Sequence, residues 1–304
     1  MIGYLYNPKC YLHDTGMHLE VFERCKSIDE LVQEKYNVVP LELKMGKKDD
    51  ILRIHREHYV DWVEHAYENG RRMIISADTI ISEGSYDIAL STATSTKSAI
   101  DFFKSGGSRA FLNIRPPGHH AEIITGQGFC FFNNIALMAK YAQDAGYEKV
   151  LIIDFDVHHG NGTQDIFYHD NSVFYFSTHE KNNYPFTGTT DEIGAGEGEG
   201  FNKNMPYEDF TEDEDFLALF EALPKDFNPD IVLVSAGYDL MRDEEISSAQ
   251  ISFEGLGKMV QKIVDDYHDK PIAFVLEGGY NLESLVQSVD VTLGILNDSD
   301  SVSP

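Results

Sequence analysis

Residues 151–164 read LIIDFDVHHGNGTQ, an apolar run that turns strongly polar where a buried strand would end. Asp154, Asp156, His158 and His159 stand within six positions of one another. Burying such ionisable groups without partners costs several kcal/mol each. We therefore expect them to be paired, bound to a metal, or open to a cleft.

Short apolar runs like the one before this stretch recur along the chain and are typical of buried strands. Between them lie segments with helical periodicity. This alternation predicts an α/β fold of three layers, with a mostly parallel sheet and helices on both faces. The expected strands lie at 1–6, 110–114, 150–155, 173–177, 231–236 and 272–277, and the clearest helices at 133–146, 213–223, 253–267 and 281–296.

The length of 304 residues and a hydrophobic content of 42% suit one large domain, which we place at 1–296, followed by a frayed tail at 297–304. No stretch approaches the roughly 20 apolar residues of a membrane helix, and the start lacks the pattern of a signal peptide. We expect a cytoplasmic protein. The three cysteines are too few and too scattered for a disulfide framework or a cysteine metal site.

The chain is strongly acidic, with a formal net charge of −27. Such a charge repels phosphate backbones and argues against direct binding of nucleic acid. It favours cationic partners or substrates, although solubility alone would also account for it.

Four of the apolar runs are followed at once by polar residues among glycines. In a parallel sheet, ligands bind outside the carboxyl ends of the strands, so residues that follow strands are candidates for chemistry. The four polar segments predict one shared site; they are RPPGHH (115–120), DVHHGNG (156–162), GYD (237–239) and GGYN (278–281).

Two of these segments contain a set of metal ligands. Residues two apart in an extended chain face the same way, so Asp154, Asp156 and His158 project together. With Asp239 the chain offers one nitrogen and two oxygen donors and an open position, which is the layout of a catalytic divalent site. Zn²⁺ is our first choice, and Fe²⁺, Co²⁺ and Mn²⁺ remain open because carboxylates are hard donors.

The blocks RPPGHHAE, GFCFFNNIALMAKY, DFDVHHGNGTQDIFY, SAGYD and LEGGYN resemble, in this order, those of the histone deacetylase family. That family includes acetylpolyamine amidohydrolases and acetoin-utilisation-type deacetylases. The resemblance extends from about residue 13 to about residue 282. It implies the arginase-like α/β fold and zinc-dependent hydrolysis of an N-acyl amide.

Carried over by position, the resemblance implies a role for each motif residue. Asp156, His158 and Asp239 would be the zinc ligands. His119 and His120 would be the tandem histidines, with Tyr280 as hydroxyl donor.

Asp154 would be the partner of His119. Together with Ser177 it would also form a monovalent-cation site for K⁺. Asn161 takes the place behind His120 where many relatives have an aspartate, as in the class II-like branch. His120 would then be oriented without being paired to a charge.

The chemistry fits these residues. A bound metal lowers the pKa of water and polarises the amide carbonyl, while a neutral His120 takes the proton and later serves as acid for the leaving amine. A carboxylate beside His119 favours its imidazolium form. Tyr280 would stabilise the oxyanion.

On the substrate side, the resemblance implies that Phe129 and Tyr184 wall an acyl-lysine tunnel, with Asp78 at its rim. Ile246 stands where polyamine-selective relatives have an acidic gatekeeper. Three departures from the family pattern concern the loops around this tunnel: Met17, Leu19 and Phe186, of which Phe186 is expected to narrow or reshape the mouth.

An apolar gatekeeper favours acylated lysine peptides or proteins as substrates, and we rank acetylated polyamines second. Glu244 and Glu245 lie close to the gatekeeper and would attract polycations. Two other functions fit the sequence less well than a deacetylase does. An arginase-like ureohydrolase needs two metal ions and further aspartates. A non-catalytic acyl-lysine binder would not need every catalytic position to be filled. The sequence leaves the oligomeric state open.

Overall fold

The apolar run at 150–154 forms the fourth strand of a parallel sheet in the computed structural model, which describes residues 1–73 and 78–300. The eight strands are β1 (Gly3–Tyr6), β2 (Val39–Pro40), β3 (Arg109–Asn113), β4 (Val150–Asp154), β5 (Val173–Glu180), β6 (Asn202–Tyr207), β7 (Ile231–Ala236) and β8 (Ile272–Leu276). Their order is β2-β1-β3-β8-β7-β4-β5-β6, and every pair of neighbours is parallel.

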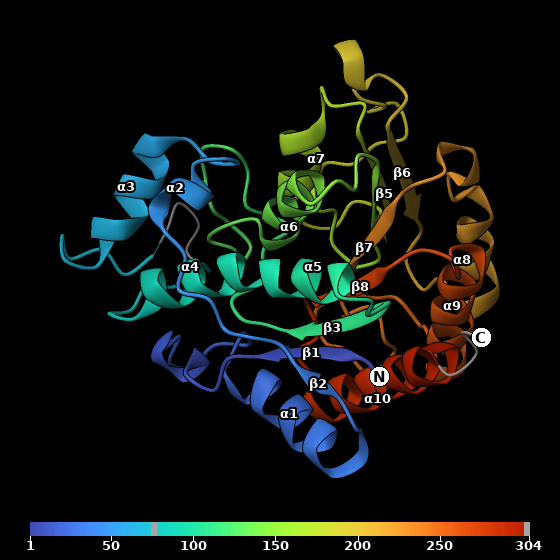
Figure 1. Cartoon of the computed structure of the whole chain (residues 1–304), viewed down its shortest axis with the longest axis horizontal. Helices are drawn as coiled ribbons and strands as arrows, with labels where there is room; N and C mark the ends of the chain where they lie inside the picture. Colours follow the sequence, from blue (N-terminus) through green and yellow to red (C-terminus); the bar gives the residue numbers. More distant parts are fainter. Residues whose placement is uncertain (74–77, 301–304) are drawn as a thin grey trace.

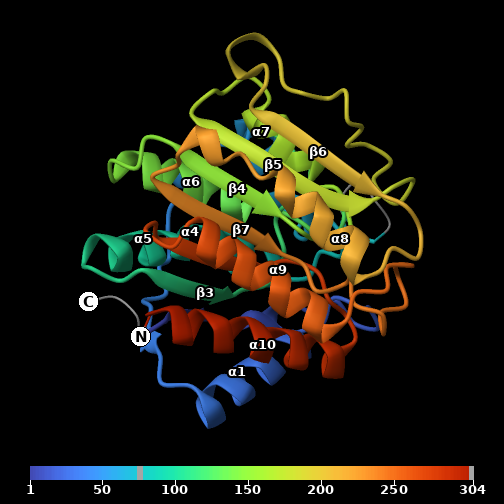
Figure 2. The same cartoon turned by 90° about the vertical axis from the view of Figure 1, so that its right-hand side faces the viewer.

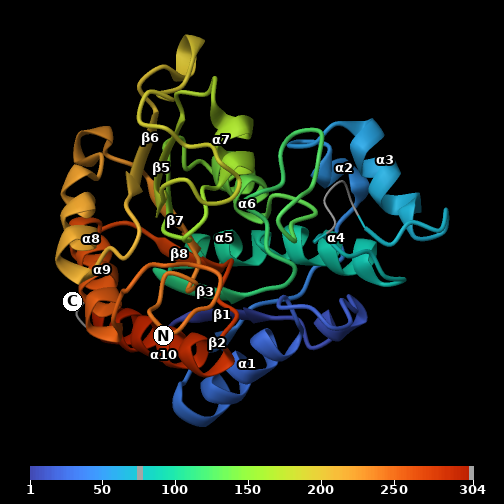
Figure 3. The ribbon, with the colours of Figure 1, turned by 180° about the vertical axis from the view of Figure 1, so that it is seen from behind.

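Helices cover both faces of this sheet, which gives the three predicted layers (Figure 1). One face carries α1 (Glu23–Lys35), α8 (Asp213–Leu219), α9 (Phe253–Asp266) and α10 (Leu282–Asp300). The other carries α4 (Ser85–Ser95), α5 (Lys97–Lys104), α6 (Asn134–Asp144) and α7 (Asn161–Phe167), with α2 (Lys48–Ile51) and α3 (Glu57–Ala66) beside them. Figure 2 shows α8, α9 and α10 in front of the sheet, and Figure 3 shows both helical layers from behind.

Alternate residues of each strand enter the two cores. Leu151 and Ile153 of β4 pack with α8, α9 and α10, whereas Val150 and Ile152 pack on the opposite face. All four side chains are fully buried. A strand buried on both faces reads as a continuous apolar run, which is why the sequence located β4 so clearly.

All six expected strands are present, and the fold class is confirmed. The edge strands β2 and β6 were not expected, because VP and NKNMPY lack a run of strand-forming residues and contain proline. Helix α10 continues through Asp300, past residue 296 where we ended the domain, so 297–300 are helical. Residues 301–304 lie outside the described part, and the single-domain division stays a prediction.

The parallel arrangement brings the carboxyl ends of β3, β4, β7 and β8 to one edge of the sheet. In the described ranges, no helix is long and apolar enough to cross a membrane.

Candidate active site

Three of the predicted metal ligands meet at this edge. Asp156 and His158 follow β4, and Asp239 follows β7, the neighbouring strand. One donor atom from each lies within 4.8 Å of the others, and no second such group occurs among the described residues. His158 Nδ1 is 3.0 Å from Asp156 Oδ1 and 3.3 Å from Asp239 Oδ2.

The donor set fits a divalent cation. Asp239 Oδ2 is buried and accepts no hydrogen bond from any described residue. Burial lowers the pKa of His158, but the two carboxylates raise it to about 10. Positive charge is therefore favoured where the three donors meet, and a metal ion would supply it.

A glycine allows this close approach of two carboxylates. Gly278 lies just beyond β8, and a Cβ atom there would stand 2.1 Å from Asp239 Oδ2 and 2.6 Å from Asp156 Oδ2. Its backbone nitrogen donates to Asp156 Oδ2 at 2.9 Å. The GGY segment thus needs glycine in order to pass against the metal ligands.

The tandem histidines follow β3, and each has its own partner. His119 Nδ1 is 3.2 Å from Asp154 Oδ2, and His120 Nδ1 is 2.8 Å from Asn161 Oδ1. Both rings are almost fully buried, and their centroids are 4.0 Å apart. The expected pairings are both present.

The two histidines differ in charge as a result. Burial lowers the pKa of His119, but Asp156 and Asp154 outweigh it and raise the pKa to about 10. Burial lowers the pKa of His120 well below its ordinary value, and the cationic His119 lowers it further. The two carboxylates therefore favour the imidazolium form of His119, whereas burial favours the neutral form of His120.

Tyr280 lies on the loop after β8. Its ring meets the Phe129 ring edge to face, with centroids 5.6 Å apart and planes at 89°. Burial raises the pKa of the phenol well above its ordinary value, so the hydroxyl keeps its proton and can donate.

These residues surround a cavity of about 250 Å³. The predicted walls and rim are present among its lining residues: Asp78, His119, His120, Phe129, His158, Tyr184, Ile246 and Tyr280. Phe129 adopts a left-handed backbone at φ 67°, after Gly128, where a Cβ atom would stand 2.3 Å from His120 Cδ2. The loop therefore packs closely against the His120 ring.

The three departures from the family pattern do not line the cavity. Phe186 is 77% exposed and lines a separate hollow of about 430 Å³ beside His179. Phe186 thus lies outside the lining of the cavity, and its effect on the mouth stays a prediction. Met17 and Leu19 are exposed.

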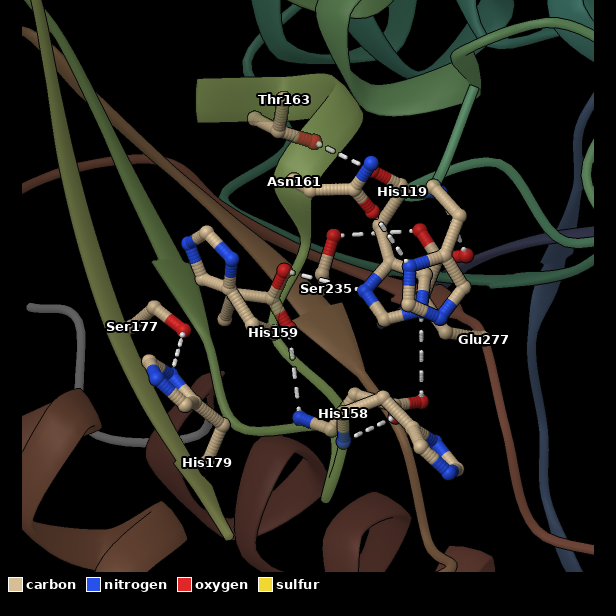
Figure 4. A network of polar contacts seen from close by, with 12 residues as sticks. His119, His158, His159, Asn161, Thr163, Ser177, His179, Ser235 and Glu277 are labelled. Atoms are coloured by element: carbon tan, nitrogen blue, oxygen red, sulfur yellow. Dashed lines mark hydrogen bonds and ion pairs between the residues drawn. The ribbon is translucent and has the colours of Figure 1, made fainter. Parts of the chain in front are cut away.

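The two proposed cation residues are neighbours across the β4–β5 pairing, where Asp154 lies opposite Ser177. Asp154 Oδ2 also accepts from Tyr175 Oη at 3.0 Å, and Ser177 Oγ is 2.9 Å from His179 Nδ1. Figure 4 shows His119 and His158 on one side of this network and Ser177 with His179 on the other. The cation site itself stays a prediction.

Sequence reasoning missed several buried charges around the site. Glu277, at the end of β8, accepts from the backbone nitrogens of Gly118 (2.7 Å) and His119 (3.2 Å) and from Ser235 Oγ (3.1 Å). Burial raises the pKa of Glu277 to about 7. Its carboxylate binds the backbone that carries the tandem histidines. Its position within the LEGGYN motif was the sequence signal that could have identified it.

Arg24 is a second missed residue, and it lies in α1 rather than in a strand-end motif. It is fully buried and donates to the backbone oxygens of Gly279 and Glu277, both at 2.6 Å. Its guanidinium carbon stands 4.8 Å from the centroid of the Tyr280 ring. No strand-end pattern could have identified it.

Glu244, which we had placed beside the gatekeeper as an attractor of polycations, has another role. Its Oε1 accepts from the backbone nitrogens of Tyr280 (2.8 Å) and Asn281 (2.9 Å), and the residue is only 9% exposed. Glu180 likewise accepts from Ser248 and from Asn183 Nδ2. Two buried carboxylates thus tie the segment after β7 to the loops that carry Tyr280 and Tyr184.

Known proteins resemble this chain along most of its length. Residues 18–296 match the histone deacetylase domain model. A "Probable deacetylase" of Archaeoglobus fulgidus is 36% identical over 88% of this chain and 76% of its own length. Histone deacetylase 15 of Arabidopsis thaliana is 36% identical over 85% of this chain, which spans about half (48%) of that relative.

Two solved structures share the fold. The crystal structure of the HDA15 HD domain superposes with a TM-score of 0.90 at 32% identity and covers 97% of this chain and 90% of that one. The acetylpolyamine aminohydrolase from Burkholderia pseudomallei also gives 0.90, at 26% identity, covering 98% of this chain and 99% of that one.

Proposed function

Because this chain belongs to the histone deacetylase family, we propose that it is a zinc-dependent amidohydrolase that removes acetyl or other acyl groups from lysine side chains of proteins. Membership in the family supports hydrolysis of acetyl amides. One observation carries the proposal: a single cavity is lined by the tandem histidines, the ligand His158, the phenol of Tyr280 and two aromatic walls.

Each residue has a task in this reaction. Asp156, His158 and Asp239 would hold the metal, which when bound polarises the amide carbonyl and activates water. His120, neutral because its pKa is lowered, accepts the water proton and returns it to the leaving amine.

A second group stabilises the negative charge that develops on the carbonyl oxygen. Tyr280 donates its hydroxyl hydrogen to the oxygen as negative charge develops there. Asp154 beside His119 favours its imidazolium form, so His119 would contribute positive charge to the same site. Asp154 and Ser177 would hold K⁺ beneath the site.

Phe129 and Tyr184 suit a straight methylene chain, since flat rings pack along it. Ile246 lines the cavity and offers no charge to a distal ammonium. Glu244 accepts hydrogen bonds from the backbone nitrogens of Tyr280 and Asn281, so its carboxylate is not free to bind a polyamine. These contacts support acyl-lysine as the substrate.

Acetylated polyamines are the second candidate, favoured by the net charge of −27 and by the Burkholderia neighbour. A substrate panel separates the two: acetyl-lysine peptides, longer acyl-lysines and acetylated polyamines at one enzyme concentration. We expect the largest kcat/KM on an acyl-lysine peptide. A preference for polyamines would overturn the ranking, and two metal ions per chain would favour the ureohydrolase.

A further inference from the structure

The amide of Asn161 has an unexpected second partner. We propose that Glu122 is a positioning residue which, through Asn161, holds His120 in the tautomer that leaves Nε2 without a proton. This inference rests on the proposed function, in which His120 is the general base. Sequence reasoning left His120 oriented but unpaired with a charge, and Glu122 supplies that charge one hydrogen bond further away.

The contacts form a short relay. Asn161 Oδ1 is 2.8 Å from His120 Nδ1, and Asn161 Nδ2 donates to Glu122 Oε1 at 2.6 Å. Gln127 Nε2 donates to the same carboxylate oxygen at 3.2 Å. His120 is 3% and Asn161 6% exposed, whereas Glu122 and Gln127 are half-buried at the outer end of the relay.

The chemistry of the Asn161 amide fixes the direction of these hydrogen bonds. An asparagine side chain can present either its carbonyl oxygen or its NH₂ group, whereas an ionised carboxylate only accepts hydrogen bonds. Glu122 therefore requires the NH₂ group of Asn161 to face it, which turns the carbonyl oxygen toward His120. His120 Nδ1 must then carry the proton, and Nε2 keeps the lone pair that a base needs.

The backbone around Glu122 holds its carboxylate in place. Its nitrogen donates to Thr125 O at 2.9 Å, and its carbonyl oxygen is 2.8 Å from Nδ1 of the buried His55. The next residue, Ile123, donates its backbone nitrogen to Asp165 Oδ2 at 3.0 Å. The carboxylate is thus aimed at Asn161 by a turn fixed at three points.

A carboxylate directly on His120 would have a different effect. It would raise the pKa of the ring, as Asp154 does for His119. Because the Asn161 amide separates the Glu122 carboxylate from His120, Glu122 selects the tautomer of His120 while the pKa of His120 stays low. Burial raises the pKa of Glu122, and the Asn161 amide opposes this rise because it donates to the ionised form.

The test begins with Glu122→Gln, which keeps the shape but can donate as well as accept, so the orientation of Asn161 is no longer specified. In the zinc-loaded enzyme with ¹⁵N-labelled histidine at mildly alkaline pH, wild-type His120 should show protonated Nδ1 and unprotonated Nε2. The variant should shift toward the other tautomer. We expect kcat to fall roughly tenfold with little change in KM, since a general base contributes about 10²–10⁴ in rate.

A second variant provides rescue. Asn161→Asp alone would place two carboxylates together and should be strongly impaired. Combined with Glu122→Gln, the new carboxylate accepts from His120 Nδ1, and the glutamine donates to it. The double variant should recover about tenfold in kcat over Asn161→Asp alone, a coupling expected of residues in one network.

Glu208→Gln is the matched control, because it makes the same carboxylate-to-amide change at an exposed residue that bonds Lys181 and not Asn161. It should leave the tautomer and kcat unchanged. An unchanged His120 tautomer in Glu122→Gln overturns the proposal, whatever happens to kcat. If wild-type enzyme hydrolyses no acyl-lysine peptide, the proposed function fails, while the nitrogen spectrum still decides the role of Glu122.

Discussion

Tyr280→Phe should separate binding from catalysis. The contacts that hold this residue are made by its ring and backbone: the edge contact with Phe129, the guanidinium of Arg24 over the ring, and the backbone bond to Glu244. Phenylalanine keeps all three, so the substitution removes only a hydroxyl group. Substrate should still bind, and the metal content should stay full.

The size of the effect follows from the role of the hydroxyl. Its raised pKa keeps it protonated, so it donates to charge that exists only in the transition state. Removing one such donor costs about 2.7–4 kcal/mol, which corresponds to a fall in kcat of roughly 10²–10³-fold with a modest change in KM.

The assay is steady-state hydrolysis of an acetyl-lysine peptide, with metal measured on the same preparations. Tyr36→Phe serves as control, because it removes a phenol hydroxyl that bonds Asp290 on α10, away from the cavity. If Tyr280→Phe keeps more than about half of wild-type kcat while chemistry limits the rate, the oxyanion role is wrong and the loop is a structural turn.

Asp239→Ala should abolish tight zinc retention together with deacylation, because two remaining ligands cannot hold the ion against a chelator; full zinc content in the purified variant would contradict the ligand assignment. Ile246→Glu should raise activity on acetylated polyamines relative to acetyl-lysine peptides, by an interaction on the order of 1 kcal/mol if partly exposed; an unchanged ratio in the substrate panel would remove Ile246 from the specificity site. Burial is the main reason that the pKa of Glu244 is raised from 4.5 to about 7. The folded state therefore loses stability relative to the unfolded state as the pH rises through that window. Glu244→Gln has no such cost, and its melting temperature relative to wild type should be higher at pH 8 than at pH 5; an equal difference at both pH values would mean that the carboxyl is not perturbed.

The central strands could be predicted because each is buried on both faces and so reads as an unbroken apolar run. Only an edge strand such as β6, whose NKNMPY sequence packs on fewer neighbours, escaped that signal. Asp156 and His158 were predictable for a related reason. They directly follow β4, and polar residues at the end of a buried strand have few positions to occupy except the carboxyl edge of the sheet.

The sequence by itself thus determined the parallel α/β fold and the edge of the sheet where the Asp/His/Asp group and the tandem histidines meet, because these depend on short-range patterns at strand ends. The roles of these residues as metal ligands and catalytic groups stay predictions. Only the tertiary structure decided which charged side chains support them. Arg24 reaches the Tyr280 loop across more than 250 residues of chain, Glu244 bonds the backbone of that loop, and Glu122 meets Asn161 from a separate segment. A charged side chain in a helix or turn has the same local sequence whether it faces solvent or a buried amide, and its partner is set by the packing of distant segments.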